Sequence, residues 1–172
     1  MNMARYYKHQ NWPLRRKVYL VLVLCVMVLI FCFSAMPGNE SSAFSGKITE
    51  WVIKIIYKDY SVMPAEQRLG AYKLMEHIVR KCAHFSEYTL LGVLIMLLFS
   101  TYSFRNKRIW ALLSSACYAV SDEWHQSFIA GRGPMIGDVL IDSAGAAVGI
   151  LIVSVFIMLR EKKNLHDNHP VT

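Results

Sequence analysis

The sequence has 172 residues, 55% of them apolar, and its mean hydropathy is +0.32. This length suits one sizeable domain, and the apolar content is too high for most soluble proteins. The formal net charge is +7, but the positive residues stand in blocks beside apolar runs and not among aromatic residues. We therefore expect no nucleic-acid partner and interpret the basic blocks as charges that orient a protein in a membrane.

The first apolar run, Val18–Ala35, has 18 residues and no charge, which is enough to cross the hydrocarbon core of a bilayer. It follows the basic residues 1–17. A cleaved signal peptide is the alternative, but Phe33 occupies the −3 position for cleavage after Ala35, where small residues are needed. We predict an uncleaved transmembrane helix that ends at Met36–Asn39, where Pro and Gly act as stop signals.

Residues 36–84 carry two amphipathic stripes. The first runs from Phe44 to Ile56 and the second from Leu69 to Val79, each with apolar residues mostly three or four positions apart. Ser61–Pro64 separates them. We expect one or two interfacial amphipathic helices, which lie along the bilayer surface or pack on the transmembrane bundle.

Three more apolar runs follow, at residues 85–102, 109–130 and 136–159. Short basic flanks decide the orientation of such spans. Five Lys and Arg precede the first span, three stand in the 103–108 loop, and three stand in residues 160–172. The sequence therefore predicts an all-α, four-span transmembrane bundle over residues 18–159, with both termini in the cytoplasm and residues 36–84 outside it.

The four cysteines form no metal-binding or redox motif. They are Cys25, Cys32, Cys82 and Cys117, and no CxxC spacing occurs. Three of them fall in or beside predicted spans. We interpret them as free thiols that behave as small apolar side chains.

Polar side chains gather near the outer ends of three predicted spans. They are His84 and Glu87 at the start of the second span, Asp122, Glu123, His125 and Gln126 in the third, and Asp138 and Asp142 in the fourth. At 1.5 Å per residue, all three groups reach the outer third of the membrane. A charged side chain at mid-bilayer costs about 2.5–3.5 kcal/mol. We therefore expect these side chains to line a polar cavity that opens outward.

The last predicted span also contains Gly145 and Gly149, four residues apart. Small residues at this spacing let two helices approach each other closely. The pattern is common in membrane helices, so a packing role is a sufficient explanation. The contact could form within one chain or between two copies.

Four sequence blocks, taken in order, resemble those of a known family. They are Ser34–Gly38, Arg80–Tyr88, Ser121–Phe128, and Gly131–Arg132 with Asp138 and Asp142–Gly145. Their order, spacing and membrane context, over roughly residues 20–155, are similar to those of the VanZ-like membrane proteins. The resemblance implies a multi-pass protein of the bacterial cell membrane. The founding member is associated with teicoplanin resistance, so the resemblance also implies a cell-envelope protein that lowers susceptibility to teicoplanin-type lipoglycopeptides.

The polar side chains support three interpretations. In the first, they form a purely structural network that fixes helix register in an accessory membrane protein. In the second, they bind a lipid-linked cell-wall precursor or a lipoglycopeptide, with Arg132 and either Lys81 or Arg80 on its phosphate or carboxylate. The candidate ligand-binding residues are Lys81, Gln126, Arg132, Asp138 and Asp142.

In the third interpretation, the chain is a hydrolase or transferase that acts on a lipid-linked phosphate. Imidazole–carboxylate pairs suit general acid–base chemistry near neutral pH. The candidate catalytic residues are His84, Glu87, Asp122, Glu123 and His125. A divalent metal could serve as cofactor, and its candidate ligands are His84, Glu87, Asp122, His125 and Asp138, with Asp142 able to complete the set. The sequence leaves open whether the chain is an enzyme, and a proton-coupled transporter is the least favoured alternative.

Overall fold

The computed structural model describes residues 12–133 and 135–168. Over these residues the chain is helical, with one short 3-10 turn and no strand, in agreement with the predicted all-α class. The elements are α2 (Trp12–Ser34), α3 (Gly38–Ile56), η1 (Tyr60–Val62), α4 (Ala65–Ser100), α5 (Lys107–Gln126) and α6 (Ile136–Asn168).

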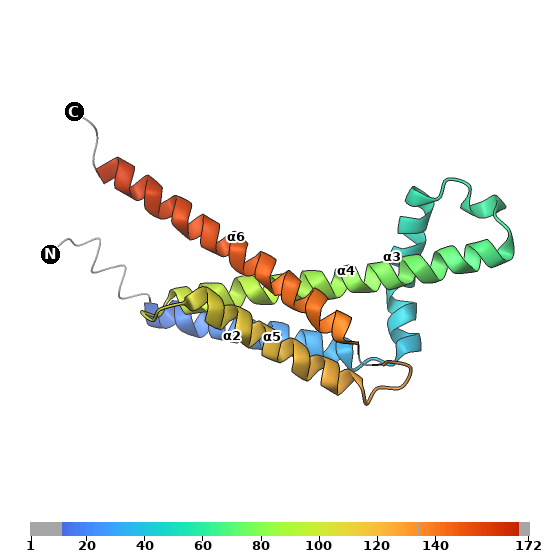
Figure 1. The fold of residues 1–172 in the computed structure, drawn as a ribbon, viewed down its shortest axis with the longest axis horizontal. Helices are drawn as coiled ribbons and strands as arrows, with labels where there is room; N and C mark the ends of the chain where they lie inside the picture. Colours follow the sequence, from blue (N-terminus) through green and yellow to red (C-terminus); the bar gives the residue numbers. More distant parts are fainter. Residues whose placement is uncertain (1–11, 134, 169–172) are drawn as a thin grey trace.

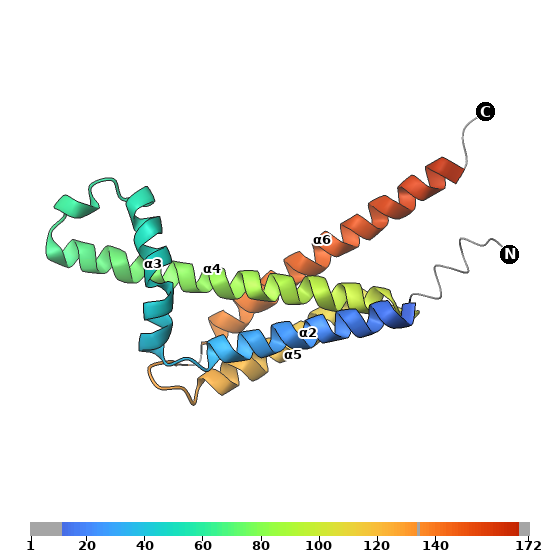
Figure 2. The ribbon, with the colours of Figure 1, turned by 180° about the vertical axis from the view of Figure 1, so that it is seen from behind.

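Helix α4 is the centre of the fold, because α2, α3, α5 and α6 all pack against it. α3 crosses α4 at a steep angle near one end of the bundle (Figure 1). The start of α2 and the end of α6 lie toward the opposite end (Figure 2). Leu91 and Ile95 of α4 form the core together with Ile30, Ala119 and Ile150 from the other three bundle helices.

Helices α4 and α6 approach each other closely at three glycines. A Cβ atom on Gly92 would collide with the backbone of Ala146, and one on Gly145 would collide with the backbone of Phe85. A Cβ on Gly149 would also meet the backbone of α4. The close helix packing predicted from Gly145 and Gly149 is confirmed, and it occurs within one chain.

Within residues 12–133 and 135–168, three helical segments are long and apolar enough to cross a membrane. They are Leu14–Ser34, Ala65–Ser100 and Ile136–Leu165. α5 contains most of the predicted third span but is not among them, because it combines serines with charged residues at both ends. It has 20 residues, which is about 30 Å of helix, and it packs on α4 and α6. A fourth span formed by α5 stays a prediction.

The second amphipathic stripe and the second predicted span belong to one helix. α4 runs without a break from Ala65 to Ser100, and therefore joins Leu69–Val79 to the residues that follow. No proline stands inside this stretch. A lone glycine such as Gly70 costs a helix about 1 kcal/mol and does not end it. The separate interfacial helix that the stripe suggests is therefore absent from residues 65–100.

Two helix ends also differ from the predicted spans. α5 ends at Gln126 and not at residue 130. The chain then turns and reaches Gly131, whose φ is +76°, a conformation that glycine adopts easily. α6 continues to Asn168 and so includes much of the expected polar tail. Residues 160–168 contain no Pro or Gly that would stop it.

Helix α3 leaves several of its apolar side chains exposed. It packs on α4 and buries Thr49 and Ile53, whereas Ile48, Trp51 and Ile55 are exposed. An exposed apolar face on a helix that crosses the end of a bundle suits a position at the bilayer surface. That position is a prediction for α3.

We expect Gly149→Ala to lower the thermal stability of the detergent-solubilised protein, because its Cβ would press on the backbone of α4. Overpacking of this kind costs about 1–3 kcal/mol. Gly137→Ala is the matched control on α6, since no described neighbour lies within 4 Å of its added Cβ. Thermal unfolding followed by circular dichroism measures both, and equal midpoints would contradict the close packing.

Candidate functional site

A hydrogen-bonded network links the end of α2, the end of α5 and the loop after α5. Ser34 Oγ donates to Asp122 Oδ2 at 2.8 Å, and Gln126 Nε2 donates to the same oxygen at 3.1 Å. Arg132 donates to Gln126 Oε1 at 3.1 Å and to the Phe33 carbonyl at 3.2 Å. The network therefore fixes one Asp122 oxygen and the direction of the Arg132 side chain.

Asp122 of this network also meets two ionisable side chains from other helices. His84 in α4, Asp122 in α5 and Asp142 in α6 each offer one ligand atom, and these atoms lie within 4.8 Å of one another. Asp122 is 3% exposed and Asp142 is 2% exposed. We call these three residues the His84–Asp122–Asp142 cluster. Their convergence places a compact group of nitrogen and oxygen donors inside the bundle.

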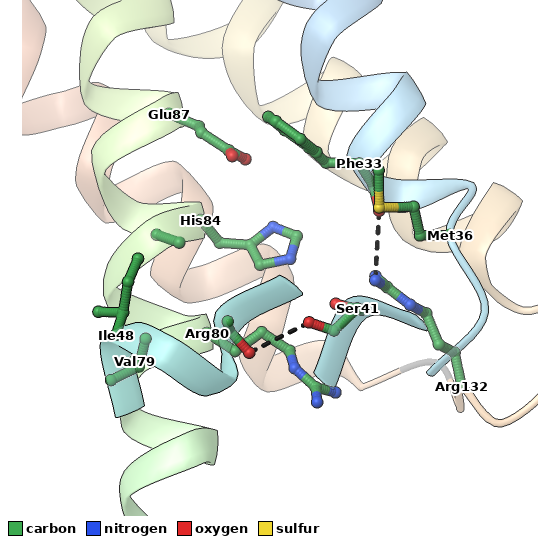
Figure 3. Close-up of a pocket in the computed structure, with 11 residues that line it drawn as sticks. Phe33, Met36, Ser41, Ile48, Val79, Arg80, His84, Glu87 and Arg132 are labelled. Carbon is green, nitrogen blue, oxygen red and sulfur yellow. Dashed lines mark hydrogen bonds between the residues drawn. The ribbon is translucent and has the colours of Figure 1, made fainter. Parts of the chain in front are cut away.

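His84 also lines a cavity of about 110 Å³ between α3, α4, the end of α2 and the loop after α5. Its polar wall consists of Arg80, His84, Glu87 and Arg132 with two serines, and its apolar wall includes Phe33, Met36, Ile48 and Val79. Figure 3 shows His84 and Glu87 projecting from α4 into the space that Arg132 faces from the other side. We call this space the arginine cavity.

Two guanidinium groups at the arginine cavity keep unused donors. Arg80 donates to Ser42 Oγ at 3.0 Å, and this contact joins α4 to α3. Arg80 also pairs with Glu76 of its own helix at 3.1 Å. The Nε atoms of Arg80 and Arg132 are buried and have no partner within the described ranges. Burial, together with the positive charge of Arg80, lowers the pKa of Arg132, although a guanidinium stays protonated in proteins. An anion between the two guanidinium groups would offset the repulsion between their positive charges.

Three other candidate residues hold elements of the fold together. Lys81 forms an ion pair with Asp138, which joins α4 to the first turn of α6. Glu123 Oε1 accepts a hydrogen bond from the backbone N–H of Met135 at 2.6 Å, and this contact fixes the chain just before α6. These partners explain Lys81, Asp138 and Glu123 as structural contacts around the site.

His125 is not part of the His84–Asp122–Asp142 cluster in the described residues. Its ring packs against Phe31 of α2, with the ring centroids 4.3 Å apart. Its Nδ1 atom is buried, and no hydrogen-bond partner for it lies in the part of the chain that the structure describes. His125 therefore faces α2, whereas Asp122 contributes to the cluster.

The observed cluster differs in membership from the predicted metal ligands. His84 and Asp122 belong to both sets. Glu87 lines the arginine cavity, and Asp138 is paired with Lys81. Asp142, which the sequence offered beside Asp138 as a residue that could complete a metal site, completes the cluster.

Two residues at the site, Ser34 and Tyr88, were not among the candidate site residues predicted from the sequence. Ser34 is a lone hydroxyl at the end of an apolar span, and only its depth, equal to that of Asp122, could have indicated it. Tyr88 follows His84 by four residues, a spacing that places both on one helix face. Arg80, expected as one of two possible partners of Arg132, belongs to a basic pair on the predicted outer side, against the usual charge distribution of membrane proteins.

We expect Ser34→Ala to destabilise the protein, because Asp122 loses one of its two donors. A hydrogen bond to a charged group contributes about 1.5–3 kcal/mol. Ser121→Ala is the matched control, since Ser121 is exposed and donates only to the Tyr118 carbonyl of its own helix. Thermal unfolding in detergent compares the two variants. If Ser34→Ala melts at the wild-type temperature, the network does not stabilise the bundle.

The family comparison covers the whole site. A family model described as VanZ/LLP1 matches residues 19–158, most of the chain. Searches of curated proteins and of solved structures gave no match. The matched range contains the hydrogen-bonded network, the His84–Asp122–Asp142 cluster and the arginine cavity, and it agrees with the resemblance seen in the sequence blocks. The chain is therefore a member of the VanZ/LLP1 family, and its long apolar helices make it a membrane protein.

Proposed function

We propose that this protein lowers the susceptibility of a bacterium to teicoplanin-type lipoglycopeptides by binding the anionic headgroup of a lipid-linked molecule in the arginine cavity. The observation that carries the proposal is the pair of guanidinium groups, Arg80 and Arg132, at one small cavity with an apolar wall. Membership of the VanZ/LLP1 family supports the link to lipoglycopeptides. The ligand class is a lipid-linked cell-wall precursor or the lipoglycopeptide itself.

The charges of the cavity favour an anion. Arg132 uses its two terminal nitrogens on Gln126 and Phe33, so its side chain is already oriented. Its Nε and the Nε of Arg80 remain available. Phosphate and carboxylate oxygens accept hydrogen bonds from guanidinium groups with charge assistance, which makes such contacts about twice as strong as neutral ones. A bound anion would therefore replace part of its hydration with charge-assisted contacts.

The size of the cavity limits what enters it. A space of about 110 Å³ admits a headgroup phosphate but not a whole lipid. The lipid chain must then lie outside the cavity, and the exposed side chains of Ile48, Trp51 and Ile55 on α3 offer an apolar surface beside it. Such a division, with a buried headgroup and a chain left in the bilayer, suits a lipid ligand.

The proposed topology places the cavity at the outer leaflet. In it α5 is a fourth span, both termini are cytoplasmic, and α3 lies at the outer surface. The basic groups 15–17, 105–108 and 160–163 lie toward the end of the bundle opposite α3 (Figures 1 and 2). Positive residues in short flanks favour the cytoplasmic side. The bilayer and a lipid-linked molecule are then the partners of the protein.

A hydrolase or transferase acting on a lipid-linked phosphate is the second candidate function. It is favoured by one observation, that His84 and Glu87 line the same cavity as the two arginines. An imidazole and a carboxylate beside a bound phosphate could transfer protons to or from it. In this alternative, His84 and Glu87 would be the catalytic residues.

We expect the protein to protect a teicoplanin-sensitive Gram-positive host, and Arg80→Met to abolish that protection at equal membrane abundance. Loss of one charge-assisted contact of about 1.5–3 kcal/mol weakens binding about ten- to a hundredfold. Glu76→Gln is the matched control, because it breaks the same ion pair but keeps the guanidinium. The minimal inhibitory concentration measures the effect. Protection by Arg80→Met equal to that of the wild type would exclude the cavity from this function.

We also expect the purified protein to retain a polyprenyl phosphate, and not the uncharged polyprenol, in native mass spectrometry from nanodiscs. The reason is that the phosphate offers several negatively charged oxygens to Arg80 and Arg132, whereas the polyprenol offers one uncharged hydroxyl. Arg80→Met should lose the bound phosphate form, and Glu76→Gln should keep it. Equal retention of both lipids by the wild type would argue against headgroup recognition. Release of inorganic phosphate from a polyprenyl diphosphate would instead favour the hydrolase.

A further inference from the structure

The His84–Asp122–Asp142 cluster has a feature that headgroup binding does not use. Within residues 12–133 and 135–168, His84 Nδ1, Asp122 Oδ1 and Asp142 Oδ1 are buried without a hydrogen-bond partner. The hydroxyl of Tyr88, a residue that is 0% exposed, is a fourth such atom. Buried polar atoms are nearly always paired, because leaving one unpaired costs free energy. Four of them on neighbouring helix faces point to a partner that the protein itself does not supply.

A hydrogen-bonded network alone does not account for the cluster. Ser34 and Gln126 both donate to Asp122 Oδ2, and no described donor reaches Oδ1. Asp142 has an unpaired oxygen although it is almost fully buried. Two carboxylates at this distance repel each other when both are charged. A divalent cation between them neutralises that repulsion and occupies the unpaired oxygens.

We propose that His84, Asp122 and Asp142 bind one divalent transition-metal ion of the Zn²⁺ or Mn²⁺ class. An imidazole nitrogen is a typical transition-metal ligand, and carboxylate oxygens suit both ions. The three ligand atoms, which lie within 4.8 Å of one another, can close on an ion at about 2.0–2.2 Å through small side-chain movements. Three rigid helices, and not a loop, hold the three ligands.

The surroundings fit such a site. Ser34 and Gln126 hold Asp122 through its second oxygen, the kind of contact that orients a metal ligand. Three protein ligands leave a coordination position open. His84 also lines the arginine cavity. With a headgroup phosphate bound in the arginine cavity, the ion would be a further cationic partner for it. This one step rests on the proposed headgroup binding.

Metal binding to the full-length protein in detergent micelles tests the proposal. After treatment with a chelator and dialysis, the protein is titrated with Zn²⁺ by calorimetry and with Co²⁺ by visible absorption. We expect one tight site in the wild type, and a dissociation constant at least about tenfold higher in Asp142→Asn and Asp122→Asn. Asp138→Asn is the matched control, because Asp138 lies one turn from Asp142 on α6 but pairs with Lys81; it should keep the site.

A second measurement guards against misfolded variants. Saturating Zn²⁺ should raise the melting temperature of the wild type and of Asp138→Asn, but not that of Asp142→Asn, because only an ion that binds the folded state stabilises it. The proposal is overturned if the wild type binds no ion, or if Asp142→Asn and Asp122→Asn bind it as tightly as the wild type. Loss of binding in Asp138→Asn to the same extent would also overturn it. No lipid is present, so the result is independent of headgroup binding.

Discussion

The close approach of α4 and α6 is the contact on which the polar site depends. Gly145 lies against the backbone of Phe85 with no room for a Cβ atom. Phe85 is the neighbour of His84, and Gly145 stands three residues after Asp142 on α6. The glycine contact therefore sets how near the His84 imidazole comes to the Asp142 carboxylate. A bundle with larger residues at this crossing would separate the two groups, so apolar packing and polar chemistry are coupled at one point of the fold.

The second constraint is the satisfaction of polar groups away from water. The end of α2 and the loop after α5 are joined to Asp122 through Ser34, Gln126 and Arg132. Hydrogen bonds of this kind specify one register of the helices, because a shifted helix would leave charged groups buried and unpaired. A role in fixing helix register is one of the interpretations that the sequence supports. Among the described residues the network also leaves Asp122 Oδ1 and Arg132 Nε unpaired, and a structural role alone does not explain those two atoms.

Much of the fold could be predicted from the sequence, and the site only in outline. Hydropathy and helix-stop residues predicted the end of α2 and the all-α class, and the depth argument brought polar residues of three helices to one level. Rotation of each helix about its axis decides which of these side chains meet, and the sequence does not show it. For this reason Asp142 joins His84 and Asp122, whereas His125 packs on Phe31. The length of α4 was underestimated because an amphipathic stripe and an apolar span were treated as separate elements.

The position of α3 has a consequence for how a ligand arrives. Ser41, Ser45 and Ile48 of α3 line the arginine cavity, so this helix covers the cavity at the end of the bundle. In the proposed orientation, α3 lies between the arginine cavity and the aqueous phase. A headgroup would then reach the cavity sideways from the outer leaflet, without leaving the bilayer first. Membrane partitioning would concentrate ligands with long chains beside the cavity and would disfavour soluble phosphates. The covering helix α3 would therefore favour lipids before any polar contact forms.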